Sequence, residues 1–260
     1  MYDLNTICEE VKKIAVEAGH AIMEIYQNEE SFGVTHKKDD SPLTIADRTA
    51  NQIICDHLVK LTPNIPIISE ENKEIDYSER KDFDYAWLVD PLDGTKEFIK
   101  RNGDFTVNIA LLHYGKTVMG IVYIPVTEAV YSAIYDKGAY ETVDGKTTKL
   151  KAPKFDMADK GLGVVCSRSH LNEGTANFIA ALNEPEKVSR GSSLKFLILA
   201  KGEAHVYPRL APTMEWDTGA AQIILEEAGG KVINEETKTP LAYNKENLLN
   251  PYFIAYGNVQ

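Results

Sequence analysis

A short stretch in the first half of the chain places two carboxylates on a tight turn. The apolar run over 85–89 is typical of a buried strand, and Asp90 follows it directly. Pro91 has no N–H group to donate and is expected to end the strand, and Asp93 then enters a turn at Gly94. Two carboxylates so close together repel each other unless a cation lies between them, and Mg²⁺ prefers such oxygen-only sites. The stretch therefore predicts a magnesium site.

The same turn is expected to bind an anion. The backbone N–H groups of Gly94 and Thr95 would be left free, and successive free amides on a turn form anion-binding sites. A divalent cation beside an anion site indicates phosphate chemistry. The alternative is a plain structural turn, because Asp and Gly are common turn residues.

Three further acidic residues are candidates for the same site. Glu70 follows a short apolar strand, as Asp90 does, so the two are expected at one sheet edge. Each candidate also has a simpler interpretation. Glu70 is then a surface acid, and Asp217 is the N-cap of the apolar helix that follows it. Asp47 is in turn the partner of Thr44 in a helix capping box.

Several polar residues in the second half of the chain have either a structural or a functional interpretation. Ser192 opens an apolar helix, where it is expected to be an N-cap, and helix starts also attract anions. Lys195 lies one turn into this helix and opposes the helix dipole, a local cost that suggests a function. For Arg209 the structural interpretation is a surface charge, and for His170 it is an ordinary loop residue.

The elements that must position these residues follow from hydrophobic periodicity. Thr6 and Glu9 have capping-box spacing at the start of the first helix, and the charged segment 72–84 is expected to be a solvated loop. Helices are predicted over 6–26, 44–61, 171–182, 192–201 and 218–228, and strands over 66–69, 85–89, 105–113, 117–123, 129–135, 162–166, 205–207 and 231–233. This order predicts a fold of the α+β or α/β class.

The best candidate for a domain boundary is the segment 152–160, which has no apolar period. We predict an N-terminal α+β half over 1–155, with Glu70 and the 90–95 turn, and a C-terminal α/β half over 156–260, with Asp217 and the polar candidates Ser192, Lys195 and Arg209. One continuous domain is the alternative.

Composition excludes several classes of protein. The 260 residues carry a formal charge of −11, which argues against a nucleic-acid-coating surface. Three scattered cysteines form no disulfide framework and no zinc spacing. No stretch approaches the ~20 apolar residues that a membrane helix needs, and the N-terminus does not look like a signal peptide. A cytoplasmic location is therefore expected.

Three dispersed motifs together resemble a known family. The sequence from Asp90 to Thr95, Glu70-Glu71 before it and the sequence from Trp216 to Ala220 after it are similar to the Mg²⁺-dependent, lithium-sensitive inositol monophosphatase superfamily. The resemblance implies a layered, alternating helix–sheet sandwich. Four further segments, over 95–101, 167–170, 191–196 and 207–209, resemble one branch of that family, the CysQ-type 3'(2'),5'-bisphosphate nucleotidases.

The resemblance implies a role for each candidate residue. Glu70, Asp90 and the Leu92 carbonyl would hold one Mg²⁺, and Asp90, Asp93 and Asp217 a second, with a weaker third ion near Glu70. Glu70 and the Thr95 hydroxyl would position the attacking water, with Asp47 hydrogen-bonded to Thr95. The implied substrate-binding residues are Leu92, Asp93, Gly94, Thr95, His170, Ser192, Lys195, Arg209 and Asp217.

The implied reaction removes the 3'-phosphate of adenosine 3',5'-bisphosphate (PAP) to give AMP and phosphate. The family also acts on the activated sulfate donor, 3'-phosphoadenosine 5'-phosphosulfate (PAPS), which implies a role in sulfur metabolism, and the resemblance leaves peripheral attachment to the inner membrane open. Two alternatives remain at this point. One is an inositol monophosphatase or sugar-bisphosphate phosphatase on the same scaffold, and the other is a non-catalytic nucleotide- or metal-binding protein. The periodicity predicts no particular oligomer.

Overall fold

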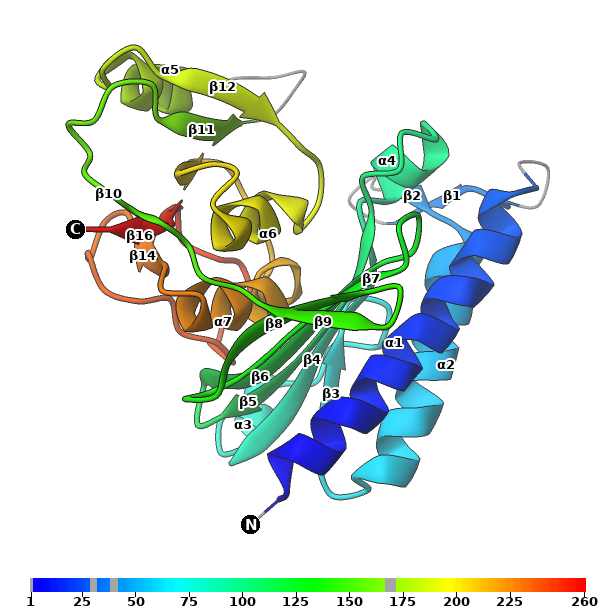
Figure 1. The fold of residues 1–260 in the computed structure, drawn as a ribbon. Helices are drawn as coiled ribbons and strands as arrows, with labels where there is room; N and C mark the ends of the chain where they lie inside the picture. Colours follow the sequence, from blue (N-terminus) through cyan, green and yellow to red (C-terminus); the bar gives the residue numbers. More distant parts are fainter. Residues whose placement is uncertain (1, 29–31, 38–41, 167–171) are drawn as a thin grey trace.

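The protein is built of alternating layers of helix and sheet (Figure 1). The computed structural model describes residues 2–28, 32–37, 42–166 and 172–260. Helices α1 (Leu4–Tyr26) and α2 (Ile45–Leu61) cover one face of a seven-stranded sheet, and α6 (Leu194–Lys201) and α7 (Gly219–Glu227) lie between that sheet and a five-stranded one. The short helix α5 (Glu173–Ala180) packs on the second sheet. The expected layered sandwich is confirmed.

The seven-stranded sheet has the order β3-β4-β5-β6-β7-β8-β9. Its first pair, β3 and β4, is parallel, and every later pair is antiparallel. Long apolar runs form its central strands because helices cover both of its faces. The strands are β3 (Ile67–Ser69), β4 (Tyr85–Asp93), β5 (Thr106–His113), β6 (Lys116–Ile124), β7 (Ala129–Ile134), β8 (Gly138–Val143) and β9 (Lys146–Lys149).

The five-stranded sheet has the order β12-β11-β13-β15-β14. Strands β12 and β15, each four residues long, were not among the strands expected from periodicity. Two small two-stranded pairs, β1–β2 and β10–β16, lie outside the large sheets. These strands are β11 (Gly163–Cys166), β12 (Glu186–Ser189), β13 (Val206–Arg209), β14 (Lys231–Asn234), β15 (Phe253–Tyr256), β1 (Thr35–His36), β2 (Pro42–Leu43), β10 (Lys154–Phe155) and β16 (Asn258–Val259).

The two long helices begin with different caps. Helix α2 begins with the predicted capping box, in which the Thr44 hydroxyl and the Asp47 carboxylate each accept a hydrogen bond from the other's backbone N–H. The capping box predicted at Thr6 is wrong: α1 begins one turn earlier, where Asp3 accepts from Asn5 N at 3.1 Å and the Thr6 hydroxyl donates to Asp3 at 2.6 Å. Asp3 precedes the apolar stripe and is the stronger cap.

The segment 72–84, predicted to be a solvated loop, is anchored in the protein. It contains the short helix α3 (Tyr77–Arg80), and the Arg80 side chain is only 1% exposed. Arg80 donates to the side chain of Asn244 and to the carbonyls of Lys245 and Glu246. Polar periodicity alone misses such an anchor, because the partners lie more than 160 residues away.

The core between the two sheets is continuous. One cluster of buried side chains includes Val122 of β6, Ile224 of α7 and Phe253 of β15. A second cluster lies under α1 and α2 on the opposite face of the first sheet. The division into halves at residue 155 stays a prediction.

None of the helices in the described parts of the chain combines the length and the hydropathy that crossing a bilayer requires.

Candidate active site

The site is built around an irregularity in strand β4. Asp90 pairs with Asn108 of β5 and Asp93 with Thr106, so two intervening residues on β4 face one on β5. Pro91 was expected to end the strand, but β4 continues to Asp93 because the bulge accommodates the missing N–H group. Pairing with β3 does end before it, at Val89. The bulge delivers both carboxylates at the end of the sheet.

Gly94 makes the turn that follows. Its φ of +99° lies in the left-handed region, and a Cβ atom there would come 2.8 Å from the Asp104 carbonyl oxygen. Helix α4 (Thr95–Ile99) starts directly after it. Within the described chain, the N–H groups of Gly94 and Thr95 donate to no other residue. The predicted pair of free amides is therefore present at the turn.

Three carboxylates converge beside the turn. Glu70, Asp90 and Asp217 each have an oxygen within 4.8 Å of the others. Withdrawal from water raises the pKa of Asp90 well above its ordinary value, and the neighbouring charges of Glu70 and Asp93 raise it further. Burial, followed by the charge of Asp93, raises the pKa of Asp217 to about 8. Three oxygen donors that repel one another fit a hard divalent cation such as Mg²⁺.

Asp93 is not part of this trio, and other residues hold one of its oxygens. Its Oδ2 lies 2.7 Å from Ser192 Oγ and 3.0 Å from Ser193 Oγ, and Asn108 Nδ2 donates to it at 3.3 Å. In the described part of the chain, no hydrogen bond reaches its Oδ1. One oxygen of Asp93 is thus held by protein donors and the other is left for a ligand.

Asp217 does not cap the helix that follows it. It ends a short 3₁₀ helix, Glu215–Asp217, and its Oδ2 accepts from the Met214 backbone N–H at 2.9 Å. Helix α7 has Thr218 at its N-cap, without a side-chain cap bond. The capping interpretation is wrong because the carboxylate accepts from Met214, which precedes it, and lies beside Glu70 and Asp90.

Asp47 has both of the roles considered for it. Its Oδ2 accepts from Thr44, as in the capping box, while its Oδ1 accepts from the Thr95 hydroxyl at 3.0 Å. Burial raises the pKa of Asp47. The Thr95 hydroxyl also lies 3.4 Å from the Leu92 carbonyl oxygen. Helix α2 therefore anchors the hydroxyl on the far side of the turn.

Lys37 was missed by the sequence analysis. Its Nζ lies 2.7 Å from Glu70 Oε1 and also pairs with Glu71. The three groups are partly buried, and no spacing relates Lys37 to the Glu pair in the sequence. This ammonium supplies positive charge to the acidic cluster.

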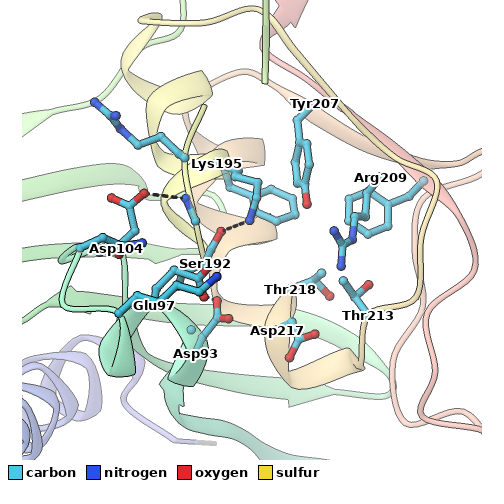
Figure 2. A pocket seen from close by; sticks show the side chains of 17 residues that line it. Asp93, Glu97, Asp104, Ser192, Lys195, Tyr207, Arg209, Thr213, Asp217 and Thr218 are labelled. Atoms are coloured by element: carbon cyan, nitrogen blue, oxygen red, sulfur yellow. Dashed lines mark hydrogen bonds between the residues drawn. The ribbon is translucent and has the colours of Figure 1, made fainter. Parts of the chain in front are cut away.

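A cavity of about 340 Å³ opens beside Asp93 and Asp217 (Figure 2). Lys195 and Arg209 both line it, and Figure 2 shows them with Tyr207 above the two carboxylates. Lys195 Nζ donates to the Ser192 carbonyl oxygen at 2.8 Å and lies over the Tyr207 ring. Arg209 Nη2 donates to Pro212 O, whereas its buried Nε has no partner among the described residues. Cations and carboxylates thus share one cavity.

The serines at the start of α6 do not cap it. Ser193 occupies the N-cap position without a side-chain cap bond, and the hydroxyls of Ser192 and Ser193 turn to Asp93 instead. The capping interpretation of Ser192 is therefore wrong. The φ of Ser192, +48°, lies in the left-handed region, where residues with side chains are uncommon.

One predicted site residue and one acid beside Asp217 remain to be described. His170 lies outside the described residues. Glu215, next to the motif of Asp217, is fully buried and accepts hydrogen bonds from the backbone of Asn244 and Lys245 and from the Lys245 ammonium. It anchors the segment to which Arg80 also binds and does not line the cavity.

Thr106, Asn108 and Ser193 were also missed, although the sequence holds a signal for the first two. Thr106 and Asn108 alternate with Val107 and Ile109 on an otherwise apolar strand, so both point to one face of the sheet. Buried polar side chains need hydrogen-bond partners. A polar pair of this kind in a central strand therefore indicates a site on that face.

Comparison with known proteins agrees with this geometry. The model of the inositol monophosphatase family matches residues 3–253. The chain belongs to the inositol monophosphatase family. Within that family, it is 43% identical over 246 residues to the 3'(2'),5'-bisphosphate nucleotidase CysQ of Salmonella typhimurium, covering 94% of this chain and 97% of that protein. The CysQ protein of Escherichia coli K12 is also 43% identical, over 247 residues, with the same coverage.

A solved structure in the inositol monophosphatase family has the same fold. The crystal structure of CysQ from Bacteroides thetaiotaomicron superposes with a TM-score of 0.85 at 40% identity, covering 100% of this chain and 99% of that one. The two sheets and the layers between them are therefore family features. The predicted family and fold are both confirmed.

Proposed function

We propose that this protein is a Mg²⁺-dependent phosphomonoesterase that removes the 3'-phosphate of PAP to give AMP and phosphate. It is a 3'(2'),5'-bisphosphate nucleotidase, as its 43%-identical relatives are named. The observation that carries the proposal is that Lys195 and Arg209 line the same cavity as Asp93 and Asp217. A substrate with two phosphates can occupy both ends of such a cavity.

The carboxylates form the metal-binding end. Glu70, Asp90 and the Leu92 carbonyl would hold one Mg²⁺, and Asp90, Asp93 and Asp217 a second, with a third near Glu70. When bound, the ions would stabilise charge on the phosphoryl group and lower the pKa of a coordinated water. The convergence of Glu70, Asp90 and Asp217 and the free Oδ1 of Asp93 support this assignment.

The Thr95 hydroxyl orients the attacking water. Because it donates its proton to Asp47, its lone pairs can accept a hydrogen bond from a water on the turn side. Glu70 would accept from the same water. A proton that leaves the water can move to Thr95 as the Thr95 proton moves to Asp47, whose raised pKa favours accepting it.

The remaining groups bind the nucleotide. The free amides of Gly94 and Thr95 would hold oxygens of the transferred phosphate. Ser192, Lys195 and Arg209 would face the second phosphate and the ribose, and the unpaired Nε of Arg209 supplies a donor for it. His170 is proposed to lie against the nucleoside. Inositol monophosphate has no second phosphate and would leave the two cations unpaired.

Phosphate release from several esters tests the proposal. PAP, PAPS, inositol 1-phosphate and a sugar bisphosphate are compared at one Mg²⁺ concentration. We expect the highest kcat/KM for PAP or PAPS. Faster hydrolysis of the inositol or sugar ester would assign the chain to another branch of the family, and binding of AMP without hydrolysis of any ester would indicate a non-catalytic protein.

Further parts of the proposal follow from the same family. Lithium sensitivity and a role in sulfur metabolism belong to the nucleotidase proposal, and a cytoplasmic location stays a prediction. The substrate is a small molecule. The net charge of −11 gives no basis for a nucleic-acid partner.

A further inference from the structure

Strand β5 carries two buried polar residues that the mechanism above does not use. Thr106 is 0% exposed and Asn108 is 1% exposed, and they stand opposite Asp93 and Asp90 in the strand register. A buried polar side chain in an apolar sheet is costly unless its groups are hydrogen-bonded. The hydrogen-bond partners of Thr106 and Asn108 therefore indicate the role of these two side chains.

Among the described residues, the side-chain partners of Thr106 and Asn108 are Asp93 itself and residues bonded to it. The Thr106 hydroxyl lies 2.9 Å from Asn108 Oδ1 and 2.7 Å from Ser192 Oγ. The Asn108 amide donates to Ser193 Oγ at 2.9 Å and to Asp93 Oδ2 at 3.3 Å. Because Thr106 engages the Asn108 carbonyl oxygen, the amide nitrogen of Asn108 is turned toward the carboxylate.

The serines complete this network from the start of α6. Ser192 and Ser193 precede α6, about 100 residues from Asp93 in the sequence, and both hydroxyls reach Asp93 Oδ2. Ser193 Oγ is also 2.9 Å from the carbonyl oxygen of Asp217. The Ser193 side chain therefore spans two of the proposed metal ligands.

We propose that Thr106 and Asn108 are positioning residues that hold Asp93 Oδ2, directly and through the two serines, so that Oδ1 is presented to a divalent cation. Neither residue would contact the metal or the nucleotide. Groups that orient metal ligands contribute strongly to affinity, and their removal commonly weakens metal binding 10- to 100-fold. The inference rests on the Mg²⁺ site of the proposed function and requires no particular substrate.

The same network couples the metal end of the cavity to the nucleotide end. The carbonyl oxygen of Ser192 accepts from Lys195, and its hydroxyl contacts Asp93 and Thr106. A phosphate bound by Lys195 therefore acts on the segment that holds Asp93. Linkage then requires AMP to raise the affinity for Mg²⁺ by the same factor by which Mg²⁺ raises the affinity for AMP.

The test measures Mg²⁺ binding to the full-length protein by calorimetry, first without nucleotide and then with saturating AMP. Thr106→Val keeps the shape of the side chain and removes the hydroxyl, whereas Thr106→Ser keeps the hydroxyl. We expect the Kd for Mg²⁺ to rise about 10-fold or more in Thr106→Val. Thr106→Ser should remain within about threefold of the wild type, and the effect of AMP on Mg²⁺ binding should be lost only in Thr106→Val.

Thr62→Val is the matched control. Thr62 is a buried threonine that accepts a hydrogen bond from the Trp87 indole, and it is the C-cap of α2, outside the cavity. We expect this variant to lower the melting temperature and leave Mg²⁺ binding unchanged. A general loss of stability would act on both threonine variants, whereas a positioning role acts only at Thr106.

Thr106→Val with a wild-type Kd and wild-type coupling to AMP would overturn the inference. If Thr106→Val shows no cooperative melting transition, Asn108→Ser decides by the same criteria. A wild-type protein that binds Mg²⁺ but hydrolyses no bisphosphate would contradict the proposed function and leave this inference standing. A wild-type protein that binds no Mg²⁺ would contradict the metal site itself.

Discussion

At the scale of single residues, the site is a set of carboxylates whose orientation is decided by their neighbours. Asp93 and Asp217 each have one oxygen held by protein donors, which are serine hydroxyls and an amide in one case and a backbone N–H in the other. Burial and mutual repulsion raise the pKa values of Asp90 and Asp217. A bound cation would remove this repulsion.

Asp93→Asn is expected to abolish phosphatase activity in a protein that still folds. The amide keeps the shape of the side chain but removes a charge from the proposed metal site, and we expect kcat/KM for PAP to fall at least ~100-fold. Phosphate release measures the loss of activity, and a far-UV circular dichroism melt shows whether the variant still folds. Near-wild-type activity would refute the two-metal assignment.

Lys195→Ala is expected to raise KM for PAP more than KM for a nucleoside monophosphate. Loss of a charge-assisted contact to the second phosphate costs about 1.5–3 kcal/mol, which corresponds to roughly 10- to 100-fold in KM. Lys201→Ala is the control, because Lys201 lies on the same helix but pairs with Glu141 and Glu203. Equal effects of Lys195→Ala on both substrates would remove Lys195 from this role.

Asp217→Asn is expected to stabilise the metal-free protein at alkaline pH. The folded-state pKa of Asp217, about 8, lies above its ordinary value of 3.8. The unfolded chain therefore loses this proton first, and stability falls as the pH rises from about 3.8 to about 8, above which both states are deprotonated. In EDTA, the melting temperature of the wild type should fall from about pH 5 to about pH 8 more steeply than that of the variant. Mg²⁺ should raise it mainly in the wild type. Parallel pH curves would contradict the assignment.

At the scale of elements, loops that lie far apart in the sequence are joined by buried charged groups. Arg80 of α3 binds the segment 244–246 from one side, and Glu215 binds it from the other, just before the metal-ligand candidate Asp217. The bulge in β4 also depends on a second element, because its shape is set by pairing with β5.

Arg80→Met is expected to lower the free energy of unfolding by about 2–4 kcal/mol. The substitution keeps much of the apolar stem but leaves the carbonyls of Lys245 and Glu246 without their donor. Urea denaturation measures the change. Arg48→Met is the control, because Arg48 is exposed and its side-chain contact is a 3.4 Å hydrogen bond to Thr35. An equal effect of both substitutions would contradict the anchoring role.

At the scale of the whole molecule, close packing of α7 on the first sheet brings Asp217 to Asp90. A Cβ atom on Gly120 of β6 would come 2.4 Å from the backbone carbonyl oxygen of Ala220. Only glycine permits α7 to approach this strand so closely. Since Asp217 directly precedes α7, the distance between helix and sheet also sets the geometry of the carboxylates.

Gly120→Ala is therefore expected to lower stability by about 1–3 kcal/mol and to weaken Mg²⁺ binding. Thermal melts and calorimetry on the full chain measure the two effects. Gly145→Asn is the control, because Gly145 lies at an open turn where asparagine tolerates the positive φ. If Gly120→Ala binds Mg²⁺ like the wild type, the position of α7 does not control the site.

What the sequence by itself determined is local. The strand that leads to Asp90, the glycine turn and the capping box of α2 depend on neighbouring residues, and their patterns predicted them correctly. The dispersed acidic motifs were enough to indicate the family. The capping interpretations of Asp217 and Ser192 failed because the competing hydrogen bonds in the folded protein were not visible from local sequence.

Only the tertiary structure decided how the candidate residues meet. The bonds from Ser192 and Ser193 to Asp93 and the pairing of Lys37 with Glu70 join segments about 100 and 33 residues apart. No residue spacing encodes such contacts, because they depend on how α6, α7 and the sheets pack together. The sequence determined which groups are available for phosphate chemistry, and the packing decided which oxygens of Asp93 and Asp217 are held by protein donors.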